Sequence, residues 1–258
     1  RALALVYKPI MNRFLHSVSK IVCTSPNYLA TSDVLNQFSD KVEVVPIGLD
    51  EASYPDVSDE LLSKTKSKFG SDFFLFVGVL RYYKGLHILL NAIRNAPYHV
   101  VVVGAGPLEN ELIAQSNTLG LDNLTLAGYV EEPEKMALFK LARAVAFPSH
   151  LRAEAFGVTL IEGAMHSNPL ISTEVGSGTS YVNLHKETGL VVPPGDVSAL
   201  RAAMDSLHQQ TDAAKEMGRQ ARNRFEQLFT DRLMGERYVQ MYWDLVEQKT
   251  PASRPSFE

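Results

Sequence analysis

Cysteine is nearly absent from this chain of 258 residues. The single Cys23 excludes an intrachain disulfide framework and a cysteine-rich zinc site, and it fits a cytoplasmic, reducing compartment. Long apolar runs are missing too: the run at 73–77 stops at Gly78, far short of the ~20 residues of a membrane-spanning helix. The formal net charge of −4 argues against a partner bound through nucleic-acid phosphates.

The first twenty residues carry four basic side chains and no acidic one. Apolar residues follow Pro9 at near-helical spacing: Ile10, Phe14, Val18 and Ile21. This pattern predicts an amphipathic helix with a basic outer face. Such a face is either a solvated surface or a peripheral contact with anionic lipid headgroups at the inner side of a membrane.

Short apolar, β-branched runs alternate with helical periods along most of the chain. Strands are expected at 21–23, 42–45, 73–79, 98–103, 124–126, 144–147, 170–172 and 190–192. Helices are expected at 86–93, 108–119, 135–141, 157–165, 197–207, 213–229 and 233–246. Strands that are apolar on both faces, with helices between them, predict a parallel sheet covered on each side. Right-handed crossovers then give a doubly wound, Rossmann-like α/β fold.

Ligands of doubly wound sheets bind at the carboxyl ends of the strands, so the loops there are candidate sites. The loop from Gly78 to Gly85 carries Arg81 and Lys84 directly before a helix. Helix-start amides and a nearby cation suit a phosphate or diphosphate, although the order of a Walker loop is absent. An ordinary surface turn is the alternative.

Two further glycine loops are weaker signals. The loop that begins Gly104-Ala-Gly106 lacks the third glycine of a dinucleotide fingerprint, because Glu109 stands there. A dinucleotide oxidoreductase is therefore a poorly supported reading. The turn from Gly128 to Val130 could border a flat ring or be simply a packed turn.

The most informative segment carries two acidic residues, Glu154 just before a helix and Glu162 inside it. If the segment were fully helical, they would lie ~12 Å apart along the axis. Between them are the free helix-start amides of Phe156, Gly157 and Val158, which suit phosphates, whereas carboxylates accept from sugar hydroxyls. Glu154 alone could serve as a helix-dipole partner. Glu162 would be a costly buried charge without a partner, which favours a functional role.

These segments resemble the family-4 (GT4) retaining glycosyltransferases of the GT-B fold. The likeness rests on Glu154-x7-Glu162 after Pro148-Ser149, on the loop from Gly78 to Gly85, on Gly104-Ala-Gly106-Pro107, and on the segments 173–178 and 188–196. It extends from about Cys23 to Tyr242. Residues 176–183 are most similar to bacterial enzymes that build O-antigen, capsule or exopolysaccharide chains, many of them mannosyltransferases.

The resemblance implies a role for each matching residue. Glu154 would hold hydroxyls of the donor sugar, and Glu162 the nucleotide ribose. Lys84 would neutralise the diphosphate in the transition state, work that a metal does in other glycosyltransferases, so neither a metal nor a cofactor is expected. Backbone amides would contact sugar and diphosphate, and the turn at Val130 would flank the base. The implied donor-binding residues are Gly78, Arg81, Lys84, Val130, Phe156, Gly157, Val158 and Glu162.

One departure concerns the glycine loop, where Val79 stands in place of the arginine usual in the family. Arg81, two residues later, is the candidate substitute. The resemblance also predicts three segments: the end of an acceptor domain at 1–48, a nucleotide-sugar domain at 49–230, and a crossing helix with its tail at 231–258. The acceptor domain of such enzymes would precede this sequence, so none of the seven histidines is assigned as its catalytic histidine.

The resulting hypothesis is a cytoplasmic, metal-independent retaining hexosyltransferase. It would move mannose from GDP-mannose, or alternatively a sugar from a UDP-sugar, to a hydroxyl of a growing, lipid-linked bacterial surface glycan. The other class of function left open is a non-catalytic module that binds a sugar nucleotide.

Overall fold

The computed structural model describes residues 2–249, and the side chains of 7–247. Within these residues six parallel strands form one sheet: β3 (Phe73–Val77), β4 (Val100–Val103), β5 (Leu124–Gly128), β6 (Ala142–Ala146), β7 (Leu170–Thr173) and β8 (Gly189–Val192). Their order across the sheet is β5-β4-β3-β6-β7-β8. All six lie close to the expected positions, and the predicted doubly wound parallel sheet is confirmed.

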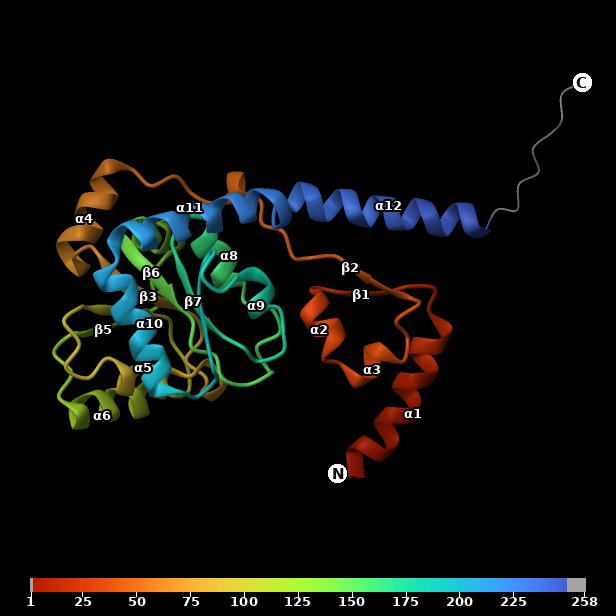
Figure 1. Cartoon of the computed structure of the whole chain (residues 1–258), viewed down its shortest axis with the longest axis horizontal. Coiled ribbons are helices and arrows are strands. Elements are labelled where there is room, and N and C mark those ends of the chain that lie inside the picture. Colours follow the sequence, from red (N-terminus) through yellow and green to blue (C-terminus); the bar gives the residue numbers. More distant parts are fainter. Residues whose placement is uncertain (1, 250–258) are drawn as a thin grey trace, which may run out of the picture.

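Helices cover both faces of this sheet (Figure 1). One layer contains α4 (Asp59–Phe69), α7 (Glu132–Leu141), α8 (Val158–Met165) and α11 (Thr211–Leu228), and the other contains α5 (Leu86–Ala92), α6 (Glu109–Leu119) and α10 (Val197–Gln209). Strand β3 shows why both layers are needed. Its five residues are all buried, and they alternate between the two apolar cores, with Leu75 in one and Phe74 and Phe76 in the other.

Some element boundaries differ from the sequence expectation. Strand β3 ends at Val77, two residues early, because Gly78 takes a φ of +156° and turns the chain. Helix α7 begins at Glu132, three residues early, with a proline in its first turn. Helix α4 was not predicted. It is mostly polar and buries only Thr65 and Phe69, so its apolar period is weak.

A smaller unit precedes the sheet domain. It contains α1 (Ala2–Ser17), β1 (Ile21–Cys23), α2 (Pro26–Ala30), α3 (Asp33–Asn36) and β2 (Val42–Val44), with β1 and β2 paired in parallel. Helix α2 packs against α9 (Thr179–Val182) of the sheet domain, and the side chain of Asn27 donates to Ser180 Oγ at 2.8 Å. The two units therefore meet near the carboxyl end of β7.

The expected helix at the start of the chain is present, but the apolar side chains opposite its basic face are not all buried. Ile10 and Phe14 are 64% and 62% exposed, and Ile21 belongs to β1. The helix meets its own unit at its carboxyl end, where Lys41 donates to the carbonyl of His16. Its earlier turns project away from that unit (Figure 1). No helix in the described part of the chain is both long enough and apolar enough to span a membrane.

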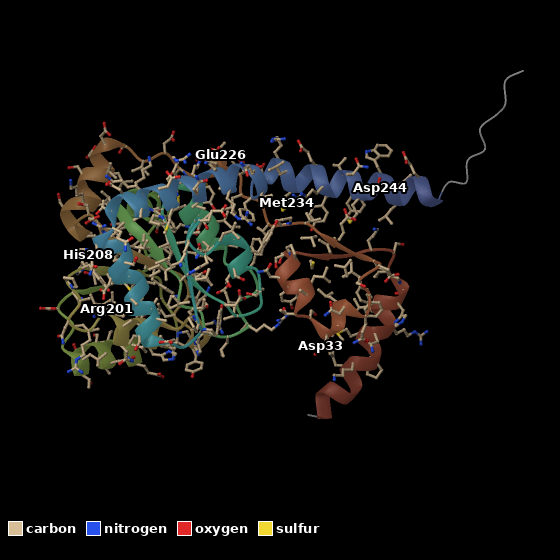
Figure 2. All side chains as sticks on the ribbon, viewed as in Figure 1. Asp33, Arg201, His208, Glu226, Met234 and Asp244 are labelled. Carbon is tan, nitrogen blue, oxygen red and sulfur yellow. The ribbon has the colours of Figure 1, made fainter. Side chains whose placement is uncertain are left out.

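The chain crosses between the two units twice. The linker after β2 pairs Leu49 with Thr230 as an isolated parallel bridge, and α12 (Asp231–Lys249) then runs back beside β2 (Figure 1). Figure 2 marks Met234 at this crossing, where the amide of Gly48 donates to its sulfur at 3.4 Å. A side chain at Gly48 would lie 2.2 Å from the carbonyl oxygen of Thr230, so glycine permits this close approach. The three-segment division remains a prediction, and the tail at 250–258 lies outside the described residues.

Candidate functional site

The crevice of the sheet lies between β3 and β6. These strands are neighbours, but β3 leads on to β4 on one side and β6 to β7 on the other, so the two following loops diverge. The first loop includes η2 (Tyr82–Lys84) and ends at Gly85, whose φ is +73°. A Cβ at Gly85 would lie 2.0 Å from the carbonyl oxygen of Pro148 in the second loop. The fold thus brings together the two loops that the sequence singled out.

Lys84 and Glu154 form an ion pair across this crevice. Lys84 Nζ lies 2.6 Å from Glu154 Oε2, and Ser149 Oγ donates to the same oxygen at 3.1 Å. The two side chains are only 12% and 9% exposed. Removal of either charge would leave the other buried and unpaired, which is costly in a region of low dielectric constant. An anionic ligand could pair with Lys84 in place of Glu154, and a ligand hydroxyl could donate a hydrogen bond to the Glu154 carboxylate.

The amino end of α8 lies directly after Glu154. Gly157 has a φ of +92°, and a Cβ there would come within 3.0 Å of Leu160. The amides of Phe156, Gly157 and Val158 donate to no other residue of the described part of the chain. These amides and the helix dipole form an environment suited to an anion.

The expectation of ~12 Å between the two acidic residues assumed a continuous helix. The segment is not a continuous helix: α8 begins at Val158, after the left-handed Gly157, so Glu154 precedes the helix and Glu162 lies inside it, as predicted. Glu154 therefore lies outside the helix and turns back to Lys84. The ring of Phe156 is buried against Phe229, so this residue offers the crevice its backbone only.

Glu162 lies inside α8 and is 6% exposed. Lys135 Nζ lies 2.8 Å from its Oε1, and the hydroxyl of Tyr54 donates to the same atom at 3.4 Å. Burial raises the pKa of the Glu162 carboxyl. Burial by itself lowers the pKa of Lys135, but hydrogen bonds to Glu132 and Glu162 outweigh it and raise that pKa overall. The buried carboxylate of Glu162, for which the sequence favoured a functional role, is therefore also held by two side chains of the protein.

Sequence reasoning missed both partners of Glu162. Lys135 stands on α7, and Tyr54 on the linker before α4. Neither belongs to a recognisable motif, and only the packing of α7 and the linker against α8 brings them together. Ser149, in contrast, was part of the Pro148-Ser149 signal and contacts Glu154 as a side chain.

The remaining predicted residues, Gly78, Arg81 and Val130, lie in the loops after β3 and β5. The amide of Gly78 donates to the carbonyl of Val103 at 3.0 Å, which ties the first loop to β4. The side chain of Val130 is packed in the core and 8% exposed. Arg81 is exposed and, with Tyr82 and five mostly apolar neighbours, lines a hollow of about 410 Å³.

His150 belongs to an aromatic cluster behind the first loop. Its ring meets those of Tyr82 and His87 edge-on, with centroids 4.9 and 5.0 Å apart. Both of its ring nitrogens are buried without a hydrogen-bond partner among the described residues. Burial lowers the pKa of His150, which keeps the ring neutral and suited to this apolar contact.

The sheet order, the crevice and the amide-lined helix start define a doubly wound α/β domain that can hold a ligand with anionic and hydroxyl groups. A profile of the family "Glycosyl transferases group 1" matches residues 57–224. The chain belongs to this family, and the resemblance read from the sequence is confirmed.

Two relatives are similar over most of the chain. D-rhamnosyltransferase WbpZ of Pseudomonas aeruginosa is 54% identical over 230 residues, which cover 89% of this chain and 60% of the relative. O-antigen chain mannosyltransferase C of Escherichia coli is 45% identical over 245 residues, which cover 95% and 66%. The chain thus spans less than two thirds of the length of each.

Solved glycosyltransferase structures share the fold. The structure of Anabaena HepE in complex with UDP and glucose superposes with a TM-score of 0.75, covering 87% of this chain and 63% of that one at 21% identity. A glycosyltransferase from Rickettsia africae superposes with a TM-score of 0.80, covering 92% and 67% at 20% identity. The predicted GT-B type fold class is confirmed.

Proposed function

We propose that the chain provides the donor site of a retaining hexosyltransferase, an enzyme that passes a sugar from a nucleoside diphosphate to an acceptor hydroxyl. The observation that carries the proposal is the buried pair of Lys84 and Glu154, 2.6 Å apart, beside the start of α8. The amides of residues 156–158 there donate to no other residue in the described part of the chain. A cation and free amides suit a diphosphate, and a carboxylate beside them suits sugar hydroxyls. A nucleotide sugar carries a diphosphate and sugar hydroxyls on either side of the bond that breaks in the transfer.

In the proposed reaction, the bond between the anomeric carbon and the oxygen of the diphosphate breaks, and its electron pair stays on that oxygen. The acceptor hydroxyl oxygen bonds to the same carbon from the same face, and its proton passes to the leaving diphosphate. Lys84 and the α8 amides stabilise the charge that develops on the diphosphate. Glu154 orients the sugar, and Glu162 accepts hydrogen bonds from the ribose. No metal takes part in this scheme.

The proposed donor is a GDP-linked sugar of the manno configuration. The names of the two relatives support this choice, since one is a D-rhamnosyltransferase and the other a mannosyltransferase. D-rhamnose is 6-deoxy-D-mannose, so the two sugars differ only at carbon 6. GDP-mannose is the first donor to test, and UDP-glucose represents the alternative nucleotide.

The proposed acceptor is a hydroxyl of a growing, lipid-linked bacterial surface glycan. The relative named as an O-antigen chain mannosyltransferase supports this class of acceptor. The proposal places the reaction in the cytoplasm, with peripheral contact at the inner face of the membrane. We propose this membrane contact because a lipid-linked acceptor would itself be anchored in the membrane.

Titration calorimetry on this chain tests donor binding with GDP-mannose, UDP-glucose and NAD. We expect GDP-mannose to bind, and E162Q to weaken that binding about tenfold, because the ribose hydroxyls then meet a neutral amide in place of a charged carboxylate. K84M should weaken GDP binding and leave guanosine binding unchanged, since only GDP carries the diphosphate. Failure of every nucleotide sugar to bind at about 1 mM (~4 kcal/mol) would refute the proposal.

Transfer is tested in the full-length enzyme. We expect E154Q to reduce transfer by about a hundredfold or more, the scale of losing one interaction that orients a reacting group, and EDTA to leave the wild-type rate unchanged. Unchanged transfer by E154Q would favour the non-catalytic binding module. Loss of transfer in EDTA would contradict the metal-independent scheme.

A further inference from the structure

We infer that Tyr54 and Lys135 are positioning residues for Glu162, and that they hold one carboxylate oxygen so that the other is presented to the ribose diol. The inference rests on the proposed function, because it gives Glu162 a nucleotide to bind. Neither residue belongs to the glycine loops or to the acidic motif. Both approach Glu162 from elements outside α8, one from α7 and one from the linker.

The two donors converge on a single atom. Lys135 Nζ lies 2.8 Å from Glu162 Oε1, and the Tyr54 hydroxyl lies 3.4 Å from the same oxygen. Within residues 7–247 no hydrogen bond reaches Oε2. A carboxylate held at one oxygen has a fixed plane, and its second oxygen remains a free acceptor. Two vicinal hydroxyls of a ribose are donors that match such an acceptor.

The charges explain why two donors are needed. Burial disfavours the ionised form of Glu162, and only an ionised carboxylate is an acceptor at both oxygens. Lys135 supplies the compensating charge, but it shares that charge with Glu132, 2.8 Å away on its own helix. Tyr54 adds a neutral donor, and burial raises the pKa of its phenol, so the hydroxyl keeps its proton. Lys135 therefore maintains the charge of Glu162, and Tyr54 helps to fix its orientation.

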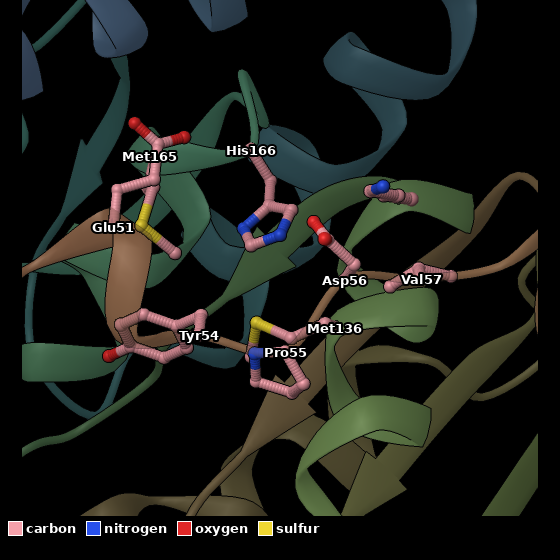
Figure 3. A pocket seen from close by; sticks show the side chains of 9 residues that line it. Glu51, Tyr54, Pro55, Asp56, Val57, Met136, Met165 and His166 are labelled. Carbon is pink, nitrogen blue, oxygen red and sulfur yellow. The ribbon is translucent and has the colours of Figure 1, made fainter.

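Tyr54 is itself held in place by the linker. The short helix η1 (Glu51–Ser53) directly precedes Tyr54. It is held by Arg222, whose guanidinium pairs with both Glu51 oxygens at 2.6 and 2.8 Å. The Tyr54 ring forms one wall of a cavity of about 120 Å³ that Met136 and His166 also line. Figure 3 shows the Tyr54 hydroxyl directed away from His166, out of this cavity. The segment that joins the two units thus reaches the predicted ribose site.

The test compares GDP with 2′,3′-dideoxy-GDP, which lacks both ribose hydroxyls. We expect the wild-type chain to prefer GDP by about tenfold or more, and E162Q to lose most of this preference. Y54F should reduce the preference severalfold, and K135M should nearly abolish it, whereas the affinity of each for dideoxy-GDP should stay at the wild-type value. K135R should recover part of the preference, because it restores a charged donor.

Matched variants control for nonspecific effects. Y98F removes a buried hydroxyl that donates to Asp205 at 3.0 Å, and K68M removes a lysine that pairs with Glu134 at 3.0 Å. Y98F makes the same change as Y54F, and K68M the same change as K135M, but each acts on a side chain paired with a carboxylate away from the crevice. They should leave the GDP preference unchanged. Thermal melts of all variants would show whether each one is folded.

The possible failures are distinguishable. If the wild-type chain binds neither GDP nor dideoxy-GDP, the proposed function fails and the inference fails with it. If the preference for GDP exists but E162Q keeps it, nucleotide binding stands and the assignment of Glu162 is wrong. If E162Q loses the preference while folded Y54F and K135M retain it, the positioning role of Tyr54 and Lys135 is refuted.

Discussion

Replacement of Lys84 by methionine tests the electrostatics of the crevice directly. The substitution keeps an unbranched apolar side chain that is shorter than lysine by one atom. The atom it removes, Lys84 Nζ, lies 4.8 Å from the centre of the Phe147 ring. The substitution thereby removes the charge that lies 2.6 Å from Glu154 Oε2. Glu154 then keeps the hydroxyl of Ser149 as its remaining partner, while its side chain is still only 9% exposed.

The expected loss of stability follows from this burial. Breaking a buried ion pair by removing one partner costs about 3–5 kcal/mol, because an uncompensated charge is left behind. Because Ser149 still donates a hydrogen bond to Glu154, we expect K84M to lower the free energy of unfolding by ~3 kcal/mol, the lower end of this range. The double variant K84M/E154Q removes both charges and should lie within ~1 kcal/mol of the wild type. The coupling between the two sites is then ~2 kcal/mol or more.

Urea unfolding of the wild type, both single variants and the double variant gives this double-mutant cycle. R232M serves as the control, since Arg232 forms an exposed ion pair with Glu236 one helical turn away at 2.6 Å. That pair should contribute only about 0.3–0.5 kcal/mol. The reasoning is refuted if K84M costs no more than R232M, or if the double variant is less stable than K84M.

Two further predictions concern glycine geometry and pH. G85A should destabilise the chain by more than G120A, measured by urea unfolding. Both glycines have a left-handed φ, +73° and +63°. A new Cβ at residue 85 would lie 2.0 Å from the Pro148 carbonyl oxygen, whereas one at residue 120 would face open space. G120A should cost ~1–2 kcal/mol for its backbone conformation alone, and equal costs would contradict the close approach of the two loops. As pH rises from below 4.5, the wild type should lose stability relative to E162Q, because the pKa of Glu162 is raised in the folded state and the unfolded chain releases its proton first. Unfolding at about pH 4 and about pH 7 measures this difference, and a constant or opposite difference would show that Glu162 is not destabilised by burial.

Much of the fold was predictable because its signals are local. A strand such as Phe73–Val77 is apolar at every position, and that pattern requires two covered faces. The first helix was harder: its apolar spacing predicted a helix correctly but did not predict that Ile10 and Phe14 would be exposed. Periodicity fixes which side chains share a face, whereas exposure depends on which elements pack against that face.

The candidate site divides in the same way. The sequence by itself determined the loops that follow β3 and β6, the glycines that let them approach, and the acidic residues at 154 and 162, since each is encoded by neighbours along the chain. Only the tertiary structure decided that Lys84 pairs with Glu154, and that Lys135 and Tyr54 share one oxygen of Glu162. These contacts join residues 27 to 108 positions apart. No local pattern encodes such pairs, because the geometry that creates them arises when separate elements pack on one sheet.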